Sequence, residues 1–220
     1  MKFLNPTVTV DVVIFTVEEG VLKTLIITRA KAPYEGLPAL PGGFIHEGET
    51  SVTAAERILR DKAGVKGVYL EQLYTFDAPT RDPRGPVFSV TYFALVPPGE
   101  AKISETIDTQ MPRFVPVSSI SKLAFDHSKI VSYAVERLKS KAEYTNVVYS
   151  LLPKSFTLTE LQKMYEITLG RDLDKRNFRK KMAELDLLEE TGASSKGGRQ
   201  RPAKLYRFKS RKPQELKKFF

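Results

Sequence analysis

Gly43-Phe-Ile-His-Glu-Gly-Glu49 opens the part of the sequence that decides the fold. The segment before it, residues 33–43, is rich in proline and glycine and predicts a loop. The segment after it, residues 51–63, predicts a helix because its apolar residues recur at i, i+3 and i+7. Gly42 and Gly43 predict a turn with positive φ, which glycine adopts at no steric cost. The chain is thus expected to pass from a loop through a turn into an amphipathic helix.

Strands surround this loop and helix. Four segments rich in β-branched and aromatic residues predict strands, the first two as a hairpin: residues 8–17, 22–28, 68–76 and 88–96. Residues 126–142 predict a second amphipathic helix. Strands and helices mixed in this order are typical of an α/β or α+β domain of about 140 residues.

The spacing within residues 43–65 resembles the Nudix box, the pyrophosphate-hydrolase signature G-x5-E-x7-R-E-U-x-E-E-x-G-U, in which U is aliphatic. The residues in register are Gly43, Glu49, Arg57, Leu59, Gly64 and Val65. The resemblance covers roughly residues 6–142. In that family, glutamates at i, i+3 and i+4 on one helical face hold magnesium beside a diphosphate.

The carboxylates of that helical face are missing. Their positions read Ile58, Asp61 and Lys62, which are a hydrocarbon, one carboxylate and a cation. A lysine would repel Mg2+, and an isoleucine can neither bind a metal nor act as a base. We therefore expect no catalytic residues, no metal and no cofactor.

Three other glutamates leave two interpretations open. Glu47, Glu49 and Glu56 could form a displaced metal site. Alternatively, Glu56 pairs with Arg60 on the helix surface and Glu49 pairs with Arg57, which would stabilise the turn into the helix.

The segment Thr80-Arg-Asp-Pro-Arg-Gly85 is similar to one shared by Nudix proteins that handle ADP-ribose and by their regulatory relatives. Two guanidiniums can grip phosphates in a bidentate manner, and a nearby aromatic ring can stack on a base. An ordinary charged β-turn shaped by Asp82 and Pro83 would explain the same residues. The residues predicted to bind an effector are Arg29, Phe44, Lys62, Phe76, Arg81, Asp82, Arg84, Tyr92 and His127.

Asp126 and His127 open the second predicted helix and are similar to an Asp-His pair in the same relatives. Asp126 is predicted to be the N-cap, because a carboxylate is favourable at the positive end of a helix. A histidine at a helix start is more often a surface or capping residue than a ligand-binding one. Both interpretations stay open for His127.

The basic charge is concentrated in the last third of the chain. Residues 1–142 hold 17 Lys and Arg against 16 Asp and Glu, whereas residues 143–220 hold 18 against 10. A step this sharp predicts a second domain with a polyanionic partner, although a solvated basic tail would have the same composition. The absence of cysteine fits a cytoplasmic protein, and no apolar run approaches the roughly 20 residues of a membrane span.

Residues 157–208 follow the order helix, short turn, helix and hairpin, which is the order of a winged helix-turn-helix. Thr157 and Glu160 predict a capping box, and the helix that they open is expected to stop at Gly170. A second helix is expected to run to about Leu187. Two strands, residues 188–191 and 203–208, flank a loop rich in glycine and basic residues.

The second of these helices has an apolar back and a basic front. Phe178, Met182 and Leu185 recur at i, i+4 and i+7, and Arg176 and Lys180 point away from them. In a helix-turn-helix the second helix enters the major groove, where arginine can read guanine and asparagine can read adenine. The residues predicted to bind DNA are Lys175, Arg176, Asn177, Arg179, Lys180, Lys196, Arg199, Arg201 and Lys204.

Residues 144–208 closely resemble the C-terminal domain of NrtR-type regulators, the Nudix-related transcriptional regulators of NAD metabolism. Three segments carry the resemblance: Leu152-Pro-Lys-Ser-Phe-Thr-Leu-Thr-Glu-Leu161, Leu173-Asp-Lys-Arg-Asn-Phe-Arg179 and Arg201-Pro-Ala-Lys-Leu-Tyr-Arg-Phe208. Together with the degenerate box, the similarity covers nearly the whole chain. It implies an α+β protein in which a Nudix-like α/β/α effector-binding domain, residues 1–143, precedes a winged helix-turn-helix domain with a basic tail, residues 144–220.

The resemblance implies a DNA-binding transcriptional regulator whose non-catalytic Nudix-like domain senses ADP-ribose or a related nucleotide or sugar metabolite. A cytoplasmic homodimer on a double-stranded DNA operator is expected, without membrane association. The alternative is an active Mg-dependent Nudix hydrolase of ADP-ribose-like nucleoside diphosphates. A third possibility, an RNA-processing Nudix protein, should prefer RNA to duplex DNA.

Overall fold

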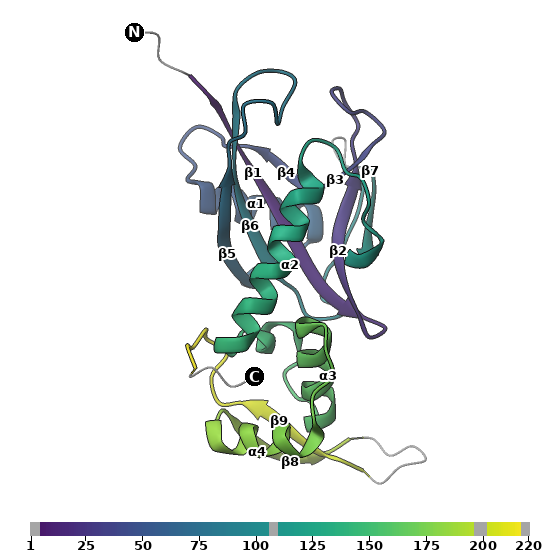
Figure 1. Cartoon of the computed structure of the whole chain (residues 1–220), viewed down its shortest axis with the longest axis vertical. Helices are drawn as coiled ribbons and strands as arrows, with labels where there is room; N and C mark the ends of the chain where they lie inside the picture. Colours follow the sequence, from purple (N-terminus) through teal and green to yellow (C-terminus); the bar gives the residue numbers. More distant parts are fainter. Residues whose placement is uncertain (1–4, 106–109, 196–201, 217–220) are drawn as a thin grey trace. The chain divides into compact units, whose positions relative to one another are not determined.

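The computed structural model of the chain describes residues 5–105, 110–195 and 202–216. It divides into two compact units (Figure 1). The first comprises residues 1–16 and 22–137, and the second comprises residues 17–21 and 138–220. The contacts thus divide the chain after Arg137, and the domain boundary after residue 143 stays a prediction. Within the described residues, no helix is both long and apolar enough to cross a membrane.

The first unit is built on one mixed sheet. Its strands are β1 (Thr7–Glu18), β2 (Val21–Thr28), β3 (Pro38–Ala39), β4 (Gly42–Phe44), β5 (Tyr69–Phe76), β6 (Val87–Leu95) and β7 (Gln110–Pro116). The main order is β3-β2-β1-β6-β5, with β4 on β1 and β7 on β2. The central pair, β1 and β6, is parallel. The four predicted strands are confirmed to within one residue at each end, whereas the short strands β3 and β4 and the later β7 were not predicted.

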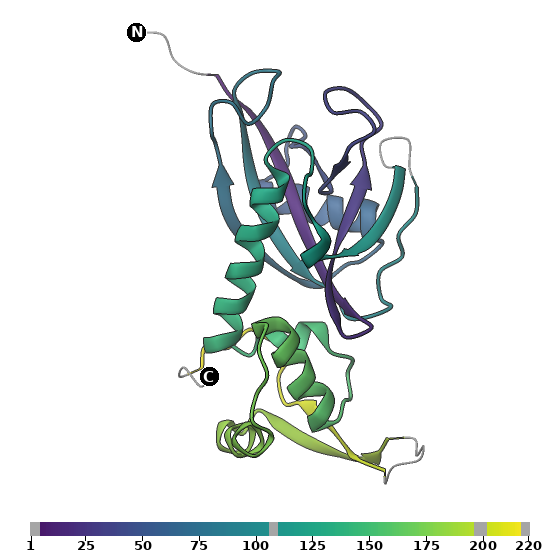
Figure 2. The same cartoon turned by 45° about the vertical axis from the view of Figure 1, so that its right-hand side comes forward.

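Two helices cover the two faces of this sheet. Figures 1 and 2 show α2 (His127–Tyr144) on one face and α1 (Ser51–Ala63) on the other. The predicted bounds of α1 are confirmed. Thr50 caps it through a capping box, and Gly64 ends it in the left-handed conformation. The apolar side of α1 packs on Val10, Val12 and Ile14 of β1, which alternate along the strand.

Gly42 and Gly43 lie in β4 rather than in the predicted turn with positive φ. Neither belongs to the glycines with positive φ, so that expectation was wrong. Gly42 is required for a different reason, which is close packing. A Cβ at this position would lie 2.0 Å from Asp11 Oδ1 and 2.9 Å from the Val10 carbonyl oxygen. The glycine therefore lets β4 approach the side chain of β1.

The second unit has the element order of a winged helix. It contains the short 3-10 helix η2 (Val147–Leu151), α3 (Leu158–Leu169), α4 (Lys175–Leu185), β8 (Leu188–Ser194) and β9 (Lys204–Phe208). The capping box of Thr157 and Glu160 and the stop at Gly170 are confirmed. α4 ends two residues before the predicted Leu187, because Asp186 adopts the left-handed conformation that closes a helix.

The chain after β9 returns to η2 and is held there by two polar side chains. Asn146 is fully buried; its side-chain amide donates to the Lys212 carbonyl (3.0 Å) and accepts from the Gln214 N–H (2.8 Å). Arg211 donates to three carbonyls at the end of η2, those of Tyr149, Leu152 and Pro153. The C-terminal segment is therefore part of the second unit.

Replacing Asn146 with alanine is expected to destabilise the second unit by about 1–3 kcal/mol, because the backbone groups of Lys212 and Gln214 lose buried partners. Hydrogen exchange of the α3 and β9 amides measures this loss. Lys212→Ala is the matched control, since that residue contributes its carbonyl to Asn146 and has an exposed position. Equal protection in both variants would contradict the role of Asn146.

Candidate functional site

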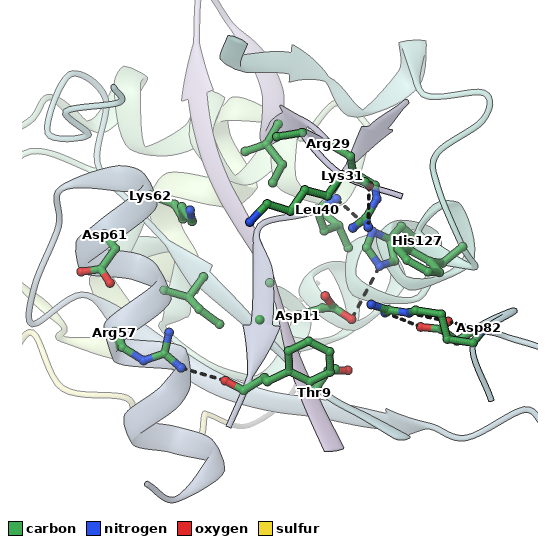
Figure 3. A pocket seen from close by; sticks show the side chains of 18 of the residues that line it. Thr9, Asp11, Arg29, Lys31, Leu40, Arg57, Asp61, Lys62, Asp82 and His127 are labelled. Atoms are coloured by element: carbon green, nitrogen blue, oxygen red, sulfur yellow. Dashed lines mark hydrogen bonds and ion pairs between the residues drawn. The ribbon is translucent and has the colours of Figure 1, made fainter. Parts of the chain in front are cut away.

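One cavity of about 540 Å3 opens in the first unit, between the sheet and α1. It is lined by β1, β2 and β4, by α1, by the loop of residues 81–84 and by the start of α2 (Figure 3). Seven of the nine residues predicted to bind an effector line it: Arg29, Phe44, Lys62, Arg81, Asp82, Arg84 and His127.

The other two predicted residues lie elsewhere. Tyr92 is 5% exposed and belongs to the core beneath α1, where its hydroxyl bonds to Ser51 Oγ at 2.9 Å. Phe76 packs edge-on against Tyr74 and Tyr133. The sequence placed both rings near the loop of residues 81–84, but the alternation of side chains along β5 and β6 turns them away from the cavity.

The loop before α1 is fixed by Glu49 and Arg57, which confirms the second of the two interpretations for Glu49. Arg57 donates to both carboxylate oxygens of Glu49, at 2.7 and 2.9 Å, and to the Phe44 carbonyl at 2.9 Å. The hydrogen bonds from Arg57, with one from the His46 N–H, lower the pKa of Glu49 to about 2. The glutamate therefore stays ionised and holds the wall of the cavity in place.

The contribution of this pair to stability is expected to depend on pH. The pKa of Glu49 falls from 4.5 to about 2 on folding, so the contribution is complete above about pH 4.5 and is lost as the pH falls toward 2. Glu49→Gln should remove this dependence and make the protein less stable at neutral pH. Thermal unfolding of both proteins between pH 2 and 7 measures the difference. Parallel curves over that range would show that Glu49 does not titrate in this way.

The face of α1 that would hold magnesium does not fit that metal. Ile58 is 2% exposed and packs in the core, while Asp61 accepts a hydrogen bond from Arg60 Nε at 3.0 Å. The structure thus pairs Arg60 with Asp61, although Glu56 was its expected partner. In the described parts of the chain, no group of three His, Cys, Asp or Glu residues is arranged to hold a metal ion.

Arg81 and Arg84 differ in what they can bind. The Arg81 side chain is 3% exposed and donates to both oxygens of Asp126, at 2.8 and 3.2 Å. It therefore joins the loop of residues 81–84 to the start of α2 and is not available to grip a phosphate. Arg84 donates to the two carboxylate oxygens of Asp82, from Nη2 at 2.7 Å and from Nε at 2.9 Å, but its side chain is 43% exposed.

The start of α2 agrees with its prediction in the position of Asp126 and differs in the role of the side chains. Asp126 directly precedes α2 and its carbonyl accepts from the Ile130 N–H, as an N-cap residue should, but its carboxylate binds Arg81. His127 is 4% exposed and is neither a surface nor a capping residue. Its Nδ1 accepts from the Leu40 N–H at 3.0 Å, and burial lowers its pKa. The neutral ring therefore carries its proton on Nε2.

Asp11 is a charged site residue that the sequence did not predict, and Phe125 is an aromatic one. Asp11 lies at the floor of the cavity, where its Oδ2 accepts from Ser89 Oγ at 2.6 Å and lies 3.6 Å from His127 Nε2. The signal was present in the sequence, because Asp11 interrupts the apolar middle of β1 with a charge. A buried carboxylate in such a strand needs polar partners, and these come from distant segments.

Cations and aromatic rings surround the entrance of the cavity. The Arg29 guanidinium lies 4.7 Å from the centre of the Phe125 ring, and Arg84 lies 5.6 Å from Phe44 and 5.7 Å from Phe125. Burial, followed by the neighbouring Arg84, lowers the pKa of Arg29. Phe44 is 46% exposed, so one large apolar ring faces solvent here. The arrangement suits an anionic ligand that also carries an aromatic ring.

The basic front of α4 is the second candidate site. Phe178 and Met182 are buried on the back of the helix, and five predicted residues are exposed: Lys175, Arg176, Asn177, Arg179 and Lys180. Figure 2 views this helix almost along its axis beside the β8–β9 hairpin. Lys204 on β9 binds both carboxylate oxygens of Glu190, at 2.9 and 3.0 Å. The predicted residues Lys196, Arg199 and Arg201 lie outside the described residues.

Two family patterns match the chain. The NUDIX domain matches residues 5–134, and the NrtR DNA-binding winged helix domain matches residues 148–208. Each match coincides with one set of the elements described above.

Two curated relatives are similar to the chain. It is 41% identical over 208 residues to the ADPR responsive transcriptional repressor NtrR of Acinetobacter baylyi, covering 93% of this chain and 82% of that protein. It is 37% identical over 129 residues to an ADP-ribose pyrophosphatase of Methanocaldococcus jannaschii, covering 59% of this chain and 73% of the relative.

Two solved structures extend the comparison. Shewanella oneidensis NrtR complexed with a 27mer DNA has a TM-score of 0.83 and 38% identity, covering 92% of this chain and 93% of that one. The NUDIX domain of the same protein complexed with ADP ribose has a TM-score of 0.57 and 36% identity, covering 62% of this chain and 90% of that one.

Proposed function

Because the chain belongs to the NrtR family of Nudix-related transcriptional regulators, we propose that it binds operator DNA through α4 and senses ADP-ribose in the cavity. The observation that carries this proposal is the pairing of a basic, exposed α4 with a cavity that contains cations and aromatic rings but in which, among the residues that the structure describes, no group of three acidic or histidine side chains is arranged to hold a metal ion. A relative that matches nearly the whole chain is described as an ADPR responsive transcriptional repressor, and a solved structure that also matches it contains NrtR complexed with a 27mer DNA.

We also propose that the cavity binds ADP-ribose without hydrolysing it. Isoleucine and lysine stand at two of the three carboxylate positions, and the remaining carboxylate, Asp61, accepts from Arg60. The alternative, an active hydrolase, is supported by the similarity to an ADP-ribose pyrophosphatase. That enzyme activity would require magnesium and would release AMP from ADP-ribose.

A ligand panel separates these possibilities. ADP-ribose at 100 times its Kd should stabilise the protein by about 2.7 kcal/mol, because it binds the folded state alone. AMP, NAD and pentose phosphates should give smaller shifts in the same thermal unfolding assay. Chromatography of ADP-ribose incubated with protein and Mg2+ should show no AMP. Release of AMP that Asp61→Ala or Glu56→Ala abolishes would favour the hydrolase instead.

The regulator is proposed to act as a cytoplasmic homodimer, since two winged helices on a two-fold operator give a specificity that one module lacks. Sedimentation of the full chain with and without DNA measures its oligomeric state. A monomer bound to a single half-site would contradict this part of the proposal.

A further inference from the structure

The floor of the cavity carries a negative charge, whereas its entrance carries positive ones. The Asp11 side chain is 9% exposed, and Figure 3 shows it between α1 and His127. Ser89 Oγ, Arg81 and His127 Nε2 all approach one of its oxygens, Oδ2, at 2.6, 3.6 and 3.6 Å. Arg81 also forms its shorter bonds with Asp126, so it balances the charge of Asp11 only in part.

The second oxygen, Oδ1, lies at the wall that Asp11 and Gly42 share. A Cβ on Gly42 would come within 2.0 Å of Oδ1, so this oxygen packs against the glycine, and a larger residue there would push the Asp11 carboxylate out of its position. Both residues line the cavity. An ionised carboxylate has acceptor sites only, so a group that meets Oδ1 must be a donor. A phosphate oxygen there would be repelled, and a sugar hydroxyl would be bound.

This charge distribution orients the ligand. The exposed Phe44 ring and the Arg84 guanidinium lie at the entrance and suit a base and the phosphates that follow it. ADP-ribose carries its second ribose at the end farthest from the base. An extended ligand with its base at the entrance therefore brings the hydroxyls of that ribose to the floor.

We propose that Asp11 determines specificity by accepting hydrogen bonds from the terminal ribose hydroxyls of ADP-ribose, with Gly42 allowing the carboxylate to take up its position at the wall of the cavity. The inference rests on the proposed function and names the part of the effector that the floor recognises. It assigns the discrimination between ADP-ribose and other diphosphates to one buried carboxylate.

A cycle of two proteins and two ligands tests the inference. Isothermal titration calorimetry compares the full-length wild type with Asp11→Asn, which keeps the size of the side chain and removes its charge. The ligands are ADP-ribose and an ADP ester whose terminal ring is tetrahydrofuran, without hydroxyls. The substitution should weaken ADP-ribose binding at least tenfold and binding of the ester less than twofold.

The outcomes are distinct. If Asp11→Asn weakens the binding of both ligands equally, the inference is overturned, because this result is expected when Asp11 contacts the base or only supports the fold. The inference is also overturned if the substitution weakens the binding of neither ligand. If Asp11→Asn does not fold, the wild type is measured with both ligands, and less than tenfold discrimination between them overturns the inference, because the ribose hydroxyls then contribute too little for hydrogen bonds to a charged acceptor. Wild type that binds neither ligand would instead refute the proposed function.

Discussion

Substitution of both Arg176 and Arg179 by alanine is expected to weaken operator binding by about 100-fold or more, since each well-placed arginine contributes about 1–3 kcal/mol. Both side chains are exposed on α4, whereas Phe178 and Met182 of the same helix are buried. The loss should therefore fall on DNA binding and leave the core unchanged. Fluorescence anisotropy measures it on duplex DNA that the wild-type protein has enriched from a random library.

The salt dependence of the same titration identifies the kind of contact. The logarithm of the binding constant falls with the logarithm of the salt concentration, and each lost phosphate contact should make this fall less steep by about 0.9. Loss of an arginine that reads a base should instead change the preferred DNA sequence. Arg60→Ala with Arg113→Ala is a matched control, because both are exposed arginines of the first unit and the net charge changes equally. Equal losses in the two double variants would show that total charge, not α4, governs binding.

Much of this arrangement could be predicted because the signals are local. The helix of residues 51–63, the capping box at Thr157, the stop at Gly170 and the two-sided pattern of α4 all depend on residues within a few positions of one another. The bond between Glu49 and Arg57 spans eight residues and was predictable from the spacing of a known motif.

The floor of the cavity could not be predicted because it depends on pairing between distant segments. Asp11, Ser89 and His127 meet only after β1 pairs with β6 and α2 crosses the sheet. Tyr92 was placed in the cavity for its closeness in sequence, yet its register on β6, beside Val12 of β1, puts its side chain in the core under α1. Gly42 was assigned to a turn, since sequence shows a glycine but not the atom that approaches it.

Replacing Arg81 with alanine is expected to cost about 3–5 kcal/mol of stability, because it leaves the carboxylate of Asp126 and the nearby Asp11 without their buried cation. Arg60→Ala is the matched control: the same residue type in the same unit, paired with Asp61 but with both side chains about half exposed, which should cost about 1 kcal/mol or less. Hydrogen exchange of the β1 and β6 amides reports the stability of the first unit in the full chain.

A paired replacement separates the charge from the packing. Arg81→Met combined with Asp126→Leu removes both ions and should recover most of the stability that Arg81→Ala loses, since apolar pairs of similar size often replace buried ion pairs without cost. Asp11 would then keep Ser89 and His127 as partners. If the double variant is as unstable as Arg81→Ala, the guanidinium acts through Asp11 rather than Asp126, and the ion pair at the start of α2 is not what holds the loop.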